Sequence, residues 1–129
     1  MLRQFFRACL LDYPVPTGIC HPLYPVGSPW EQEIVDGITD SELADCFTAA
    51  AQKGLSIEIH ACLYRNGTKR DKDGLSPSYL RILSAAKACG CKFHFGSDAH
   101  EPGAFHGVHR LLRRAAQRVG ITEADLWQL

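Results

Sequence analysis

Two short segments of the chain alternate strictly between apolar and polar residues. In Leu55–His60 every second residue is leucine or isoleucine, and in Lys92–Asp98 the two phenylalanines are opposed to His94, Gly96 and Asp98. A period of two residues is typical of a β-strand with one apolar and one polar face. The shorter segment Gly18–His21, which ends before Pro22, is a third candidate. The pattern therefore predicts three strands.

Helix start and stop signals lie between and after these strands. Serine or threonine precedes an apolar stripe with a spacing of three to four residues, and glycine follows it. Both signals are present in Thr39–Gly54 and Ser76–Gly90. A third helix, from about Ala104 to Val119, is expected to close at Gly120, and Thr122–Asp125 is expected to cap a short terminal helix. Met1–Leu11 is interpreted as the last turns of a further helix.

Strands that alternate with helices predict a parallel sheet, so the fold class is α/β. A polar second face is typical of the lumen of a β/α barrel near its catalytic end, whereas a strand whose polar face meets water is the alternative. Three strands cannot close a barrel, because closure takes about seven or eight. Residues 1–129 are therefore expected to form a single, partial domain whose open sheet edges are covered by self-association or by another chain segment.

Composition narrows the classes of partner. The chain has 129 residues, of which 46% are apolar and 22% charged, and its formal net charge is zero. A neutral chain is not expected to bind nucleic acid or an anionic membrane, and no apolar run approaches the roughly 18 residues of a membrane span. A cytoplasmic location is expected. The six cysteines form no C-x-x-C pair and are interpreted as reduced, mostly buried thiols.

The strongest chemical signal is Gly96–His100, at the end of the third predicted strand. Asp98 and His100 can direct a carboxylate oxygen and an imidazole nitrogen at one cation, and such donors suit Zn, Mn or Fe. A turn with a surface histidine is the alternative. His21 lies at the end of another strand, and a third ligand from there would complete an open catalytic metal site.

The predicted central strand carries two further polar residues, Glu58 and His60, on its polar face. An isolated buried charge is costly, so these side chains are expected to orient metal ligands or to line a substrate pocket. His94 lies deeper in its strand and is interpreted as structural.

Three segments, Gly18–Pro22, Ser56–His60 and Phe95–His100, resemble in order and spacing three motifs of the polymerase and histidinol phosphatase (PHP) family. The first resembles a small apolar strand that ends in His-Pro. The second resembles a Glu-hydrophobic-Asn strand, with His60 where asparagine is more usual. The third is similar to the final Gly-Ser-Asp-x-His motif, and the resemblance covers the chain from about residue 15 to its end.

The resemblance implies the C-terminal half of a distorted (β/α)7 barrel that hydrolyses phosphate esters with divalent metal ions (Zn, Mn or Fe). It makes His21, Asp98 and His100 metal ligands, with Asp98 and His100 as the catalytic pair. The partner implied is a small phosphorylated substrate, such as histidinol phosphate. The expected substrate-binding residues are Glu58, His60, Arg65, Lys69, Arg70 and His106.

The chain also departs from the family pattern. Members of the family open with a His-x-His strand end, and the six histidines of this chain form no such pair. We therefore expect a truncated chain or a partner that supplies the missing half, and little activity from this chain alone. The alternative is a catalytically silent metal-binding or interaction module derived from a PHP domain. The neutral charge argues against the PHP module of a DNA polymerase.

Overall fold

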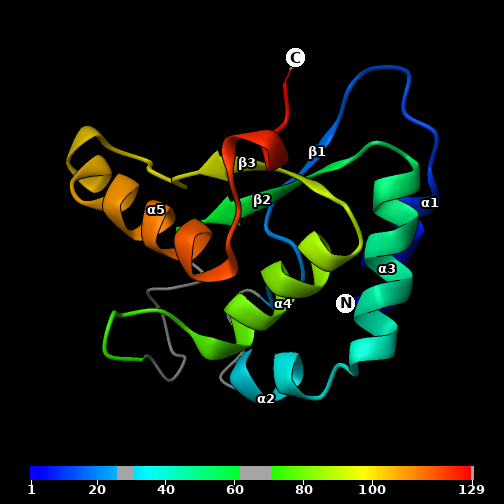
Figure 1. Cartoon of the computed structure of the whole chain (residues 1–129), viewed down its shortest axis with the longest axis horizontal. Coiled ribbons are helices and arrows are strands. Elements are labelled where there is room, and N and C mark those ends of the chain that lie inside the picture. The colour runs from blue at the N-terminus through cyan, green and yellow to red at the C-terminus, as the bar shows by residue number, and fades with distance from the viewer. Residues whose placement is uncertain (26–30, 62–70, 129) are drawn as a thin grey trace.

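The computed structural model describes residues 1–25, 31–61 and 71–128. Three parallel strands, β1 (Gly18–Ile19), β2 (Ser56–His60) and β3 (Lys92–Gly96), form an open sheet in the order β1-β2-β3. Helices connect successive strands, as Figure 1 shows. The predicted α/β class and the three predicted strands are confirmed.

Two strands end earlier than the sequence pattern predicts. β1 ends two residues before His21, and β3 ends two residues before Asp98. Both residues have left-handed backbone angles, with φ of 52° at His21 and 51° at Asp98. A strand needs extended dihedrals, so a left-handed residue cannot continue it. His21 and Asp98 therefore lie in the turns just after the strands, at the carboxyl edge of the sheet.

The helices are α1 (Leu2–Leu10), α2 (Glu31–Asp36), α3 (Asp40–Gln52), α4 (Pro77–Ala88) and α5 (Val108–Val119), with the 3-10 turns η2 (Pro102–Phe105) and η3 (Glu123–Asp125). Thr39 and Glu42 form the predicted capping box at the start of α3, and Pro77 opens α4 as predicted. Thr122 and Asp125 form a second capping box, on η3. Sequence reasoning did not predict α2.

The predicted helix Ala104–Val119 is wrong at its first turn. A 3-10 turn occupies Pro102–Phe105, and α5 begins only at Val108. Gly107 separates them with a left-handed φ of 77°, which interrupts right-handed helical geometry. His106 lies on the link between the two elements.

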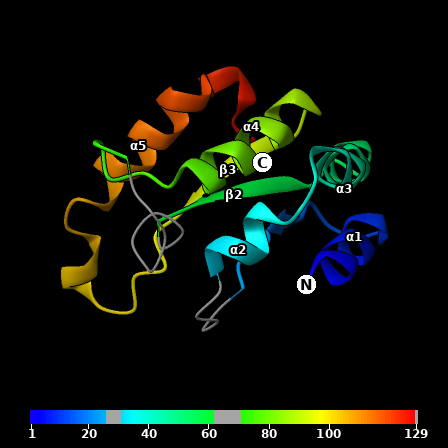
Figure 2. The same ribbon diagram turned by 90° about the horizontal axis from the view of Figure 1, so that it is seen from below.

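The core lies between the apolar face of the sheet and the helices. Ile57, Ile59 and Phe93 are fully buried on that face. Figure 2 shows α4 and α5 on the same side of strands β2 and β3, with α1 against α3. Phe5 of α1 and Phe47 of α3 meet edge to face, with ring centroids 5.6 Å apart.

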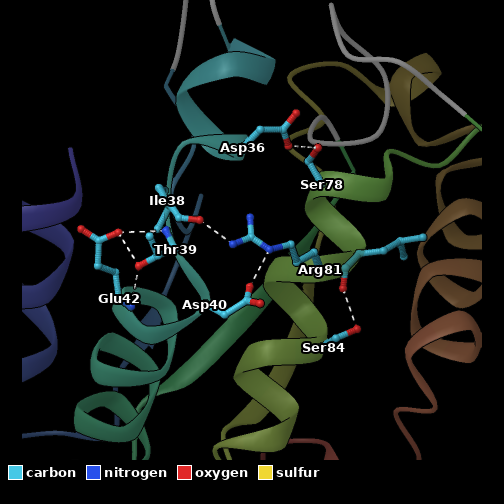
Figure 3. Close-up of polar contacts among 9 residues, drawn as sticks. Asp36, Ile38, Thr39, Asp40, Glu42, Ser78, Arg81 and Ser84 are labelled. Atoms are coloured by element: carbon cyan, nitrogen blue, oxygen red, sulfur yellow. Dashed lines mark hydrogen bonds and ion pairs between the residues drawn. The ribbon is translucent and has the colours of Figure 1, made fainter.

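Polar contacts join α4 to α2, to α3 and to the link between these two helices, as Figure 3 shows. The guanidinium of Arg81 donates from Nε to Asp40 Oδ1 at 2.8 Å and from a terminal nitrogen to the carbonyl of Ile38. The Ser78 hydroxyl donates to Asp36 Oδ1 at 2.5 Å. These contacts satisfy a backbone carbonyl beside the first turn of α3 and hold three helices in register.

The outer edge of β3 is partly covered by the C-terminal segment. Phe93 and Leu126 form an isolated parallel bridge, and the Trp127 N–H donates to the Phe93 carbonyl at 2.8 Å. This contact pairs backbone groups near the start of β3 that would otherwise be exposed at the edge of the sheet. None of the described helices combines the length and apolar character needed to cross a membrane.

The described cysteines are free thiols. Cys9, Cys46 and Cys91 are buried and Cys89 is partly buried, as predicted, whereas Cys20 is exposed. Cys62 lies outside the described residues. Burial raises the pKa of Cys9 and Cys91 to about 12 and that of Cys46 to about 11, so these thiols are protonated and unreactive at neutral pH.

Candidate metal centre

Three side chains meet at the carboxyl edge of the sheet, one from the end of each strand. His21 follows β1, His60 is the last residue of β2, and Asp98 follows β3. Because the strands are parallel, their carboxyl ends lie at the same edge. One ligand atom from each of these residues lies within 4.8 Å of the other two. This grouping is compatible with one metal ion.

The distances place the predicted residues close together. His21 Nε2 lies 3.9 Å from Asp98 Oδ1, and His100 Nε2 lies 3.4 Å from the same oxygen. The rings of His21 and His60 are also adjacent, with centroids 4.0 Å apart. The His100 side chain is 88% exposed, so it approaches Asp98 from the solvent side.

His60, predicted as an orienting or substrate-binding residue, thus lies in the donor group itself. The structure places the predicted ligand His100 beside that group, next to Asp98. The pattern of alternation placed His60 on the polar face of β2. That His60 lies beside His21 and Asp98 follows only from the arrangement of the three strands.

Glu58 holds the His21 member of this group in place. Its side chain is only 5% exposed, and Oε2 accepts a hydrogen bond of 2.7 Å from the backbone N–H of His21. His60 is fully buried at 0% exposure. The alternative in which this strand face meets water is therefore wrong for both residues. A carboxylate that accepts the His21 N–H fixes the turn at which the imidazole leaves β1.

Gly96 makes room for Glu58. A Cβ atom at position 96 would lie 1.5 Å from Glu58 Oε1, which is far inside van der Waals contact. The two residues are on neighbouring strands, with Glu58 paired to His94 and His60 paired to Gly96. Position 96 therefore requires glycine for a steric reason, because the carboxyl group of Glu58 occupies the volume that any side chain would need.

A second donor group lies deeper along the same sheet face and was not predicted. One ligand atom from each of Cys20, Glu58 and His94 lies within 4.8 Å of the other two. Cys20 Sγ lies 4.0 Å from His94 Nε2, and the other ring nitrogen, Nδ1, shares a 2.9 Å hydrogen bond with the Ser56 hydroxyl. The sequence alone did not indicate this group, because only the parallel register of β2 and β3 aligns Glu58 with His94.

The electrostatic surroundings favour neutral imidazoles in both groups. Burial lowers the pKa of His60, an effect that the Glu58 carboxylate opposes. Burial also lowers the pKa of His94. Partial desolvation raises the pKa of the Cys20 thiol, and the negative charge of Glu58 raises it further. Neutral imidazole is the form that binds metal ions, so no proton has to leave these rings first.

The remaining predicted site residues are placed less closely. His106 is exposed after η2. The predicted phosphate-binding residues Arg65, Lys69 and Arg70 lie outside the described residues.

The fold and these side chains define an α/β chain with candidate metal-binding groups at the carboxyl edge of an open parallel sheet. Comparison with known proteins adds no family to this description: no family model, no curated protein and no solved structure matches the chain.

Proposed function

We propose that this chain carries part of the metal centre of a metal-dependent phosphoesterase that hydrolyses small phosphate esters. The observation that carries the proposal is the convergence of His21, His60 and Asp98, whose ligand atoms lie within 4.8 Å of one another. A metal ion with three protein ligands at the carboxyl edge of the sheet would keep coordination positions for substrate and water.

The donor set fits a divalent transition ion. Two imidazole nitrogens and a carboxylate oxygen suit Zn, Mn or Fe. In a tetrahedral site with bonds of about 2.1 Å, neighbouring donor atoms lie about 3.4 Å apart. His21 and Asp98 are 3.9 Å apart, so each would move inward by only a few tenths of an ångström. Burial keeps His60 neutral, which the bound state also requires.

Such an ion would polarise a phosphoryl oxygen of the substrate and lower the pKa of a water molecule beside it. The residues of the chain do the positioning. Asp98 supplies the negative charge of the site, and Glu58 holds the His21 backbone through its 2.7 Å hydrogen bond. His100 is exposed 3.4 Å from Asp98, where its ring can contact the substrate or transfer a proton to the leaving oxygen.

The same proposal treats the open sheet as the C-terminal half of a PHP-type β/α barrel. Two features support it: the strands are parallel with helical connections, and the polar side chains of β2 are buried rather than exposed. In this arrangement Arg65, Lys69 and Arg70 remain the predicted contacts of the substrate phosphate, and His106 remains a predicted contact of the substrate.

Metal titration tests the proposal directly. The chain is stripped with a chelator and titrated with Zn²⁺ and Mn²⁺ by calorimetry, and hydrolysis of p-nitrophenyl phosphate and histidinol phosphate is then followed with each ion. Asp98→Asn keeps the size of the side chain but removes its charge. We expect it to weaken metal binding on the order of 100-fold and to reduce any hydrolysis to background.

Asp12→Asn is the matched control, because Asp12 is 89% exposed and pairs with Lys53 rather than with any site residue. It should bind metal and hydrolyse ester like the unmodified chain. Equal metal affinity and equal turnover in Asp98→Asn would overturn the proposal.

A silent metal-binding module is the second candidate. It is favoured by the small number of donors in the group of His21, His60 and Asp98 and by the open edges of a three-stranded sheet. Metal binding that depends on Asp98, without metal-dependent hydrolysis of either ester, would support this module in place of the enzyme.

A further inference from the structure

Cys20, Glu58 and His94 form a compact group on the polar face of the sheet, one residue from each strand or its immediate end. Two of the possible ligand atoms, Cys20 Sγ and His94 Nε2, lie 4.0 Å apart. In a tetrahedral zinc site a sulfur and a nitrogen ligand lie about 3.6 Å apart, so the pair is near the required spacing.

The surroundings of the group orient its ligands. The fully buried Ser56 hydroxyl bonds Nδ1 of His94 at 2.9 Å and thereby directs Nε2 toward Cys20. A partner on the far nitrogen is the usual arrangement for a metal-binding histidine, because it fixes the ring and its tautomer. With Nδ1 as the donor to Ser56 Oγ, Nε2 presents a lone pair to the group.

Two glycines provide the space that these side chains occupy. A Cβ at Gly18 would lie 2.7 Å from the His94 ring and 2.8 Å from Ser56 Oγ, and a Cβ at Gly96 would lie 1.5 Å from the Glu58 carboxyl. The outer strands therefore lack a side chain at the positions where the ligands from the other strands cross them. The sheet backbone therefore leaves room for the side chains of Glu58 and His94.

We infer that Cys20, Glu58 and His94 form a second metal site, specific for a thiophilic divalent cation of the zinc class and distinct from the group of His21, His60 and Asp98. Sulfur, carboxylate and imidazole are a mixed donor set that zinc accepts, whereas Mg²⁺ and Ca²⁺ prefer oxygen alone. On binding, the Cys20 thiol loses its proton to solvent, and the thiolate forms the metal–sulfur bond.

Such an ion would join all three strands at their carboxyl ends. Cys20 lies on the chain segment that continues β1, Glu58 is on β2 and His94 is on β3. Glu58 also accepts the His21 N–H, so the second site adjoins the first. The inferred role is structural: the ion fixes the open sheet and the turn that carries His21.

Cobalt titration tests this site independently of hydrolysis. Co²⁺ bound by a thiolate gives an intense near-ultraviolet charge-transfer band, which oxygen and nitrogen ligands do not produce. The chain, reduced and metal-free, is titrated with Co²⁺ and then with Zn²⁺ as competitor. We expect the band to appear with one equivalent of Co²⁺ and to disappear when Zn²⁺ is added.

Cys20→Ser should abolish the band and weaken zinc binding at this site on the order of 100-fold. Cys62→Ser and Cys89→Ser are the controls for the other thiols, and both should keep the band. Asp98→Asn should also keep it, since Asp98 belongs to the other group. Because Cys20 is exposed, its serine variant is expected to fold, and circular dichroism checks this.

A band that survives Cys20→Ser, or that is lost in Cys62→Ser or Cys89→Ser, would overturn the assignment. Absence of the band in the unmodified chain with saturating Co²⁺ would do so as well. Loss of the band in Asp98→Asn would show one shared ion and refute the separate site. None of these outcomes depends on phosphoesterase activity, so the inference and the proposed function fail separately.

Discussion

The carboxyl group of Glu58 lies where a side chain at Gly96 would have to be, since a Cβ there would come within 1.5 Å of Oε1. The same carboxyl group accepts the backbone N–H of His21 at 2.7 Å. Glu58 thus connects β3 with the turn after β1, and its position depends on the absence of a side chain at residue 96.

We expect Gly96→Ala to destabilise the protein by about 1–3 kcal/mol, the usual cost of forcing an extra methyl group into a packed site. The added methyl would displace Glu58 and break its bond to His21. Urea denaturation measures the change. Gly103→Ala is the matched control, because a Cβ at Gly103 meets no atom within 4 Å, and it should leave the free energy of unfolding within about 0.5 kcal/mol of the original.

A double-mutant cycle isolates the contact between the two residues. In a chain that carries Glu58→Ala, the additional change Gly96→Ala should cost much less than it does alone, because the carboxyl group is no longer in the way. Additive effects of the two changes would show that Gly96 is needed for another reason.

Glu58→Gln should retain the fold, since the amide fills the same space and its oxygen can accept the His21 N–H. The charge is lost, however, and the negative charge of Glu58 raises the pKa of His60. We therefore expect the pKa of His60, followed by NMR in metal-free buffer, to fall further in this variant. A pKa that rises or stays constant would contradict the described electrostatics.

Acidification should destabilise the metal-free protein through His60. Burial lowers the pKa of this ring in the folded state, so between the unfolded value of about 6.5 and the folded value the unfolded chain binds more protons. The free energy of unfolding should be insensitive to His60 above about pH 6.5, and below it should fall by at most about 1.4 kcal/mol per pH unit.

Denaturation curves between pH 7.5 and 5 give this slope. His60→Asn should reduce it, whereas His106→Asn, which changes an exposed histidine, should not. Equal slopes in the original chain and in His60→Asn would mean that other groups cause the acid sensitivity.

Loss of the capping box should weaken α3. The Thr39 hydroxyl accepts the Glu42 N–H at 3.2 Å, and Glu42 Oε2 accepts the Thr39 N–H at 2.8 Å. Thr39→Ala removes the first bond and the bond that the Thr39 hydroxyl donates to Glu42 Oε2, at an expected cost of about 1 kcal/mol in thermal or urea unfolding. Ser84→Ala is the comparison on α4, where the hydroxyl bonds only the Leu80 carbonyl within the helix, and it should change stability by less than about 0.5 kcal/mol.

Local patterns were sufficient for the main elements of the fold. Alternation predicted β2 and β3, and the capping box at Thr39 predicted the start of α3, because both signals depend on residues close in sequence. The six-residue helix Glu31–Asp36 was missed since it is too short to show a helical period. The left-handed Gly107 was visible as a glycine, but its φ was not, and the start of α5 was therefore misplaced.

The candidate site shows the same limit. His21, Asp98 and His100 stood out because each lies at the end of a predicted strand. The relation of Cys20 to His94 was hidden, since 74 residues separate them and only the parallel register of three strands brings them together. The burial of Glu58 likewise depends on Gly96 of the neighbouring strand, which no single-strand pattern reveals.

The left-handed backbone at His21 and Asp98 has a consequence for ligand binding. For residues other than glycine this conformation costs on the order of 1 kcal/mol each, so contacts of the folded chain have to hold it, as the Glu58 carboxylate does at the N–H of His21. A turn held in this way leaves a bound cation little chain entropy to remove. Binding should consequently be fast and accompanied by small structural change, as expected of a preorganised receptor.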